Sequence, residues 1–139
     1  MDNLIVWLID DNPMNNLMIE KLMYSYSDKI KTVSFDNAKT PISLLNSDKI
    51  SAPNLILLDL YLPEYSGIDF INDFRQLNLS ETKIIVITST NQIKDIETVS
   101  LYNLKYLPRP LFVDDLEDIF GKKDEFNSVK NMLRFLSKN

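Results

Sequence analysis

Short apolar runs alternate with helix-like patterns along almost the whole chain, and this alternation constrains the fold more than any other feature. The runs are rich in aliphatic and β-branched residues, as buried strands are. They occupy residues 4–9, 30–35, 54–59, 83–88 and 104–107. Because each run is followed by a helical pattern after a short link, the five strand-then-helix units predict one parallel sheet with helices on both faces, an α/β fold.

Capping residues mark the beginnings of two predicted helices. Asn12 and Pro13 form an N-cap followed by a first-turn proline. Ser66 begins a capping-box pattern with Asp69. Apolar residues follow at helical spacing in both places, namely Met14, Leu17, Met18 and Leu22 in the first and Phe70, Phe74 and Leu77 in the second. The pattern over 91–102 has a thinner apolar stripe and predicts an exposed, weakly held helix with Ile93, Ile96 and Val99.

The length fits one ordinary domain. The chain has 139 residues, of which 45% are apolar and 25% charged, as in globular proteins. Since the last alternating unit ends near Gly121, we divide the chain into a domain over 1–122 and a C-terminal extension over 123–139. Apolar residues at helical spacing predict an extra helix in the extension, with Phe126, Val129, Leu133 and Leu136. We favour packing of this helix onto the domain over contact with a second copy.

Several residue types are missing, and their absence excludes classes of chemistry. The chain has no cysteine and no histidine, which excludes disulfides, thiolate zinc sites, and Ser–His or Cys–His catalysis. Its two glycines, Gly67 and Gly121, cannot form a GxGxxG or Walker loop.

The net charge of −5 argues against nucleic acid or an anionic membrane as the main partner, and is compatible with a protein partner or a bound cation. The apolar run at 4–9 is too short to span a membrane and lacks a basic leader. We therefore expect a cytoplasmic protein.

Acidic side chains follow two of the predicted strands. Asp10 and Asp11 follow the first, and Asp59 interrupts the apolar run LILLDLYLP at the end of the third. A lone carboxylate in such a run costs several kcal/mol unless it is neutralised. Ligands of open parallel sheets bind beyond the carboxyl ends of the strands, where these acids are expected to meet. Neighbouring carboxylates need a counter-charge, and Mg²⁺, which prefers oxygen ligands, can provide it.

Two further residues lie at the same predicted edge. Thr88 ends the fourth strand and Arg109 follows the fifth. Each residue also has an interpretation unrelated to a site. Asp10 or Asp11 could cap the first helix. Thr88 alone fits a strand end, and Arg109 alone fits a surface charge, so it is the joint placement that favours a site.

Four segments together resemble a known family. LIDDNPMNN, LILLDLYLPEYSG, VITST and YLPRP resemble, in order and spacing, the signature blocks of the response-regulator receiver domain of two-component signalling. The resemblance covers residues 4–121. It implies a flavodoxin-like, doubly wound sheet with strand order 2-1-3-4-5.

The resemblance implies that Asp59 is the phospho-acceptor, which takes a phosphoryl group from a phosphohistidine on a sensor histidine kinase or a histidine phosphotransfer protein. It implies a Mg²⁺ or Mn²⁺ site in which Asp11 and Asp59 are direct ligands and Asp10 acts largely through water. The backbone carbonyl of Tyr61 would complete the protein's ligands. The side chain of Tyr61 either shields the acceptor from attacking water or packs on the surface.

The resemblance also implies roles for loop and switch residues. Pro63 and Gly67 match the loop and helix start after the acceptor. Thr88 matches the hydroxyl that bonds the phosphoryl group, and Tyr106 matches the switch aromatic. Phosphorylation would draw both inward and bias the helix over 91–102.

Arg109 departs from the family pattern, which has a lysine before the proline. A guanidinium binds phosphate well but is larger than an ammonium and differently shaped. We expect Arg109 to neutralise charge on the phosphoryl group and the Arg109–Pro110 peptide to be cis. A pseudo-receiver, which is a protein-interaction module with impaired switching, is the alternative.

We therefore expect a single-domain response regulator rather than an enzyme, with at most self-phosphorylation from small donors and autodephosphorylation. It would switch a surface for a downstream target protein, or relay the phosphoryl group, as a monomer or weak homodimer. A hydrolase of the dehalogenase or phosphatase class is a rival, but it usually has a second acid where Tyr61 stands. Flavin binding is another, but the DDNP segment would repel a phosphate.

Overall fold

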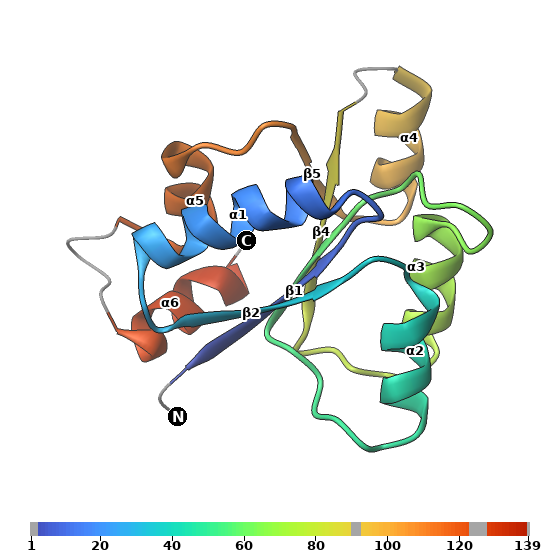
Figure 1. The fold of residues 1–139 in the computed structure, drawn as a ribbon, viewed down its shortest axis with the longest axis horizontal. Coiled ribbons are helices and arrows are strands. Elements are labelled where there is room, and N and C mark those ends of the chain that lie inside the picture. The colour runs from blue at the N-terminus through green and yellow to red at the C-terminus, as the bar shows by residue number, and fades with distance from the viewer. Residues whose placement is uncertain (1–2, 90–92, 123–127, 139) are drawn as a thin grey trace.

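A computed structural model describes residues 3–89, 93–122 and 128–138 of the chain. Its strands form one five-stranded parallel sheet in the order β2-β1-β3-β4-β5 (Figure 1). They are β1 (Leu4–Ile9), β2 (Ile30–Phe35), β3 (Leu55–Leu58), β4 (Lys83–Thr88) and β5 (Lys105–Pro108). This order confirms the flavodoxin-like fold that we expected.

Helices cover both faces of the sheet, as the strand–helix alternation predicts. On one face lie α1 (Pro13–Tyr26), α5 (Val113–Phe120) and α6 (Val129–Lys138), and on the other α2 (Lys39–Asn46), α3 (Gly67–Arg75) and α4 (Ile93–Leu101) (Figure 1). Strand side chains alternate between the two layers because successive residues of a strand point to opposite faces. Leu4, Val6 and Leu8 of β1 belong to the first core, whereas Trp7 and Ile9 belong to the second.

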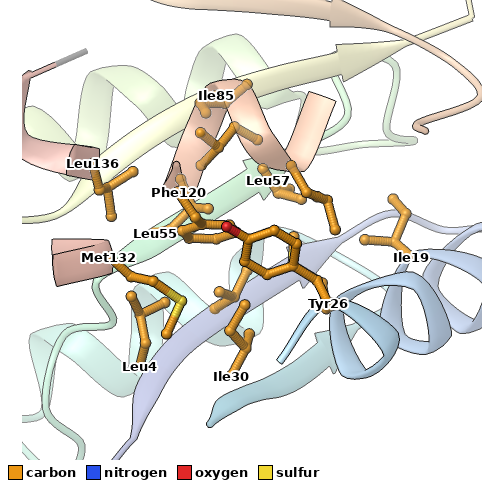
Figure 2. Close-up of a cluster of buried hydrophobic side chains, with 14 of the residues drawn as sticks. Leu4, Ile19, Tyr26, Ile30, Leu55, Leu57, Ile85, Phe120, Met132 and Leu136 are labelled. Carbon is orange, nitrogen blue, oxygen red and sulfur yellow. The ribbon is translucent and has the colours of Figure 1, made fainter. Parts of the chain in front are cut away.

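The C-terminal helix α6 is part of the core of the domain. Val129, Met132 and Leu136 are buried on it, and the ammonium group of Lys83 donates to the Leu136 carbonyl at 2.8 Å. Figure 2 shows Met132 and Leu136 beside strand residues of the same cluster. The extra helix that we expected is therefore present and packed on the sheet, while Phe126 lies outside the described residues.

The first helix has a different buried face from the one its apolar residues indicate. Met14, Leu17 and Met18 are 59%, 40% and 58% exposed. The buried positions are Asn16, Ile19, Met23 and Tyr26. Asn16 determines this orientation because its side-chain amide donates to the backbone carbonyls of Asp10 and Phe35, both at 3.3 Å. A polar residue thus occupies the stripe that an apolar pattern would assign to the core.

The thin stripe of α4 agrees with the exposed helix that we predicted. Val99 is buried, whereas Ile96 is 40% exposed, and the side chain of Ile93 lies outside the described residues. Some boundaries shift by a residue, since the predicted strands over 54–59 and 104–107 are Leu55–Leu58 and Lys105–Pro108.

Candidate functional site

Three carboxylates meet beyond the carboxyl ends of β1 and β3. Asp10, Asp11 and Asp59 each offer an oxygen atom, and these oxygens lie within 4.8 Å of one another. The strand register brings them together, because Ile9 pairs with Leu58 and the amide of Asp59 donates to the Ile9 carbonyl at 3.0 Å. The acids at the ends of two adjacent parallel strands therefore lie side by side.

The environment of Asp59 disfavours its charged form. Burial, and to a smaller extent the neighbouring charges of Asp10 and Asp11, raise the pKa of the carboxyl to about 6. The backbone N–H of Tyr61, which donates to Asp59 Oδ1 at 3.1 Å, and the Arg109 charge both lower this pKa. A cluster of carboxylate oxygens under this repulsion is a donor set that fits a hard divalent cation such as Mg²⁺ or Mn²⁺.

Asp10 is buried and has several partners. Its Oδ1 accepts from the backbone N–H of Asn12 at 2.8 Å, and its Oδ2 accepts from the side-chain amide of Asn15 at 3.1 Å. The N-cap of α1 is Asn12, whose side chain accepts from the Met14 amide. The Asp10 carboxylate therefore orders the entry to the helix without being its cap, and it faces the other two acids.

Arg109 points into the acidic cluster. Its guanidinium forms an ion pair with Asp10 Oδ2 and lies 3.9 Å from Asp59 Oδ2, with the side chain only 14% exposed. The Arg109–Pro110 peptide is cis, as expected. The backbone N–H of Arg109 donates to the Thr88 carbonyl at 3.1 Å, which fixes the loop against the end of β4. The surface-charge interpretation of Arg109 is therefore wrong.

Thr88 and Tyr106 lie on the neighbouring strands β4 and β5. Thr88 is buried at the end of β4, and the register places it opposite Pro108 of β5. Tyr106 is half-buried on β5 opposite Val86 and packs against the core that includes Val99 of α4. Thr88 thus lies at the carboxyl-end edge of the sheet, and Tyr106 lies in the core layer that Val99 of α4 shares.

Gly67 allows the loop after Asp59 to close tightly. A Cβ atom at this position would lie 2.5 Å from the Asp59 carbonyl oxygen and 2.8 Å from the Leu60 Cα, so a side chain would displace the backbone. The amide of Gly67 donates to the Leu60 carbonyl at 3.0 Å. The predicted capping box of Ser66 and Asp69 is present and begins α3, while Pro63 is exposed in the loop.

Tyr61 extends from this loop to α4, a connection that the sequence does not indicate. Tyr61 is 57% exposed, and its hydroxyl donates to Asp95 Oδ1 in the first turn of α4. Asp95 itself is buried. Its position in the sequence, within an exposed helical pattern, is typical of a solvated acid.

An apolar groove of about 360 Å³ lies beside Arg109, between α1 and the loop after β5. Met18, Ile19 and Leu22 line it from α1, and Pro110 and Leu111 from the loop. The groove brings exposed apolar surface next to the acidic cluster. Within the described parts of the chain, every helix is too short or too polar to cross a lipid bilayer.

Comparisons with a family model and with curated proteins indicate the same family. Residues 6–120 match the model of the response regulator receiver domain. The chain is 29% identical over 125 residues to the probable C4-dicarboxylate response regulator DctR of Halalkalibacterium halodurans, covering 86% of this chain and 51% of that protein. It is 31% identical over 93 residues to the nitrate/nitrite response regulator protein NarL of Escherichia coli, covering 67% of this chain and 41% of that protein. The chain thus spans about half the length of the curated relatives it matches.

Solved structures share the fold at low sequence identity. A two-component response regulator from Cytophaga hutchinsonii superposes with a TM-score of 0.75 at 19% identity, covering 90% of this chain and 99% of that one. A response regulator receiver protein from Pseudomonas putida gives a TM-score of 0.70 at 21% identity, covering 100% and 99%. With the family model matching most of its length, the chain belongs to the response regulator receiver domain family.

Proposed function

We propose that the protein accepts a phosphoryl group on Asp59 in a metal-dependent reaction and passes the signal on through a protein-binding surface. The observation that carries this proposal is the convergence of three carboxylate oxygens within 4.8 Å, with the Arg109 guanidinium 3.9 Å from Asp59. The donor is a phosphohistidine on a sensor histidine kinase or a histidine phosphotransfer protein.

In the reaction, a carboxylate oxygen of Asp59 attacks the phosphorus atom of the phosphohistidine. The P–N bond breaks, its electron pair stays on the imidazole nitrogen, and that nitrogen takes up a proton from solvent. The product is an acyl phosphate on Asp59. Because the carboxylate is a weak nucleophile, the chain's contribution is positioning and charge neutralisation.

The residues around Asp59 divide this work. Asp11, Asp59 and the Tyr61 carbonyl would hold Mg²⁺ or Mn²⁺, with Asp10 acting largely through water, and the bound ion would supply neutralisation of the phosphoryl charge. The Tyr61 N–H holds one carboxylate oxygen of Asp59, which directs the other toward the donor. Arg109 supplies a second positive charge to the phosphoryl group. To do so, its guanidinium exchanges its ion pair with Asp10 for one with the phosphoryl oxygens.

The signal leaves through Thr88 and Tyr106. Thr88 bonds the new phosphoryl group, Tyr106 turns inward, and the population of α4 positions shifts. A downstream target protein reads this change, or the phosphoryl group is relayed to another protein. We propose a signalling role without substrate turnover beyond self-phosphorylation from small donors and autodephosphorylation.

The surface beside the site supports a protein donor. A donor must bring its phosphohistidine to Asp59, so its contact surface has to adjoin the acidic cluster. Met14, Met18 and the groove beside Leu111 provide exposed apolar area there. Such donors are met in the cytoplasm, which is the location that we propose. We also propose that residues 1–122 form the receiver domain, with 123–139 as an extension, and that the protein is a monomer or weak homodimer.

The test is phosphorylation by acetyl phosphate with and without Mg²⁺, followed by intact mass measurement. We expect one added phosphoryl group that requires Mg²⁺ and is absent from Asp59→Ala. Asp28→Ala, which removes an exposed acid outside the cluster, is the matched control and should be labelled like the wild type. Equal labelling of Asp59→Ala would overturn the assignment.

A pseudo-receiver is the second candidate, and one contact favours it. Arg109 is engaged with Asp10, so its charge is committed within the site before any phosphoryl group arrives. If this pairing persists, the fold would bind partners without switching. Absence of Mg²⁺-dependent labelling, together with unchanged partner binding in Asp59→Ala, would support this candidate over the first.

A further inference from the structure

Tyr61 connects the proposed phosphoacceptor directly to α4. Its backbone N–H donates to Asp59 Oδ1 at 3.1 Å, and its side-chain hydroxyl donates to Asp95 Oδ1. The negative charge of Asp59 also acts on this hydroxyl and contributes to its raised pKa. The bond to Asp95 raises the pKa of Tyr61 most, with smaller increases from burial and from the Asp95 and Asp59 charges. One residue thus contacts the acceptor through its backbone and the first turn of α4 through its side chain.

Asp95 is an unusual residue for the first turn of an exposed helix. An acid there is favourable near the positive end of the helix dipole, but that effect does not require burial. Asp95 is only 8% exposed, and its Oδ2 is buried without a hydrogen-bond partner among the described residues. A buried carboxylate with one oxygen unpaired is costly. Its hydrogen bond from Tyr61 therefore keeps this carboxylate in place.

Within the described ranges of the chain, helix α4 has few other attachments near its first turn. Among its described side chains, Val99 is the one apolar residue in the core, since Ile96 is 40% and Leu101 is 85% exposed. The far end is held separately, where the Arg75 guanidinium donates to the Tyr102 carbonyl and lies 5.2 Å from the centre of the Tyr102 ring. Release at the first turn would therefore free one end of the helix while the other stays anchored.

We propose that Asp95 is a positioning residue for the acceptor site, and that its hydrogen bond with Tyr61 is a latch that phosphorylation opens. In the unmodified protein the latch holds α4 against the loop after β3. A phosphoryl group on Asp59 would add three acceptor oxygens and negative charge beside the backbone of Tyr61, whose hydroxyl already responds to the Asp59 charge. These oxygens compete with Asp95 for the hydroxyl proton, and Asp95 then reaches solvent as the first turn of α4 moves. This second step rests on the proposed function, whereas the latch itself does not.

The latch is tested on the unmodified 139-residue chain by hydrogen exchange of the α4 amides. We expect Tyr61→Phe and Asp95→Ala each to accelerate exchange about tenfold, which corresponds to the loss of one charge-assisted hydrogen bond. The double variant should exchange no faster than either single one, because both changes remove the same contact.

A second tyrosine–aspartate pair provides matched controls. The Tyr65 hydroxyl donates to Asp73 Oδ2 at the surface of α3, so this hydrogen bond, unlike that of Tyr61, has no partner on α4. Tyr65→Phe and Asp73→Ala should leave α4 exchange within about twofold of the wild type. The latch is refuted if Tyr61→Phe behaves like wild type, or if the control pair accelerates α4 as strongly.

The opening step is tested with beryllofluoride, a phosphoryl analogue, in the presence of Mg²⁺. We expect α4 exchange in the loaded wild type to reach the rate of unloaded Tyr61→Phe, with no further acceleration on loading of that variant. Loading of Asp59, seen by ¹⁹F NMR, with unchanged α4 exchange would refute the opening step alone. Failure of Asp59 to bind beryllofluoride would instead contradict the proposed function. The latch would then still be tested by hydrogen exchange of the unmodified wild type and variants.

Discussion

At the scale of single residues, Asp59 is placed where its charge destabilises the metal-free fold. Burial raises its pKa from 3.8 to about 6, so the folded state binds more protons than the unfolded state between these values. Stability from this group is therefore fully present below pH 4 and is lost as pH rises through about 6. Above that range the penalty is constant.

We predict that Asp59→Asn increases the free energy of unfolding by about 1–3 kcal/mol at pH 7.5 without metal. Urea denaturation in the presence of a chelator measures this change, and the difference from wild type should vanish near pH 4. Asp28→Asn, an exposed replacement of the same kind, should change little. A less stable Asp59→Asn protein at pH 7.5 would contradict the assigned environment.

Arg109 is the second residue whose position makes a sharp prediction. Its guanidinium pairs with Asp10 and stands 3.9 Å from Asp59, so it competes with a metal ion for the same negative charge. Arg109→Ala should tighten Mg²⁺ binding about tenfold, measured by isothermal titration calorimetry. Labelling by acetyl phosphate should nevertheless slow, because the second cation at the phosphoryl group is lost.

The opposite directions of these two effects separate a competing, catalytic arginine from a merely structural one. Arg134→Ala removes an exposed arginine of α6 and should alter neither quantity. If Arg109→Ala weakens Mg²⁺ binding instead, the guanidinium supports the metal site rather than competing for it, and the prediction fails.

The sequence indicates some of these residues and not others, for a physical reason. Asp10, Asp11 and Asp59 could be predicted to meet, because parallel strands bring their carboxyl ends to one edge. Asp95 could not, because its burial depends on where the Tyr61 side chain reaches across the loop. Meetings that follow from the common direction of parallel strands can be predicted from the chain, whereas contacts made by one side-chain conformation cannot.

At the scale of elements, strands were more predictable than helix faces. A buried parallel strand is recognisable as a continuous apolar run, and all five runs became strands. The face of α1 was not recognisable because Asn16 occupies the buried stripe, where it bonds two backbone carbonyls. The apolar residues Met14, Leu17 and Met18 are exposed as a result.

Helix α6 makes a prediction at this scale, because its apolar side belongs to the core. Met132 is completely buried among the side chains shown in Figure 2. Met132→Ala should lower the free energy of unfolding by about 2–5 kcal/mol. Met18→Ala, at an exposed methionine of α1, should change it by less than about 0.5 kcal/mol. Equal stability of the two variants in urea denaturation would show that α6 does not contribute to the core.

At the scale of the whole molecule, the two faces of the sheet divide the work of the proposed function. The acidic edge receives the phosphoryl group, and α4 and α1 lie in opposite layers (Figure 1). The apolar groove lies beside α1. The residues alone predicted a parallel sheet with a reactive edge, whereas the strand order came from the family resemblance. Apolar patterning specifies which segments are strands but not which strand lies next to which.

Because the groove and the acidic cluster are separate surfaces, docking of a phosphodonor protein should be separable from the phosphorylation reaction at Asp59. Met18 is 58% exposed and lines the groove beside Arg109 without belonging to the acidic cluster. Met18→Gln should lower phosphoryl transfer from the histidine kinase or phosphotransfer protein that phosphorylates the wild type by about tenfold, since buried apolar anchors dominate interfaces. Labelling by acetyl phosphate should stay within about twofold, because a small donor needs no docking surface.

Leu101→Gln, at an 85% exposed residue of α4, is the control and should leave both reactions unchanged. Parallel loss of both reactions in Met18→Gln would mean that the groove shapes the site itself, and equal loss in Leu101→Gln would place the donor on α4.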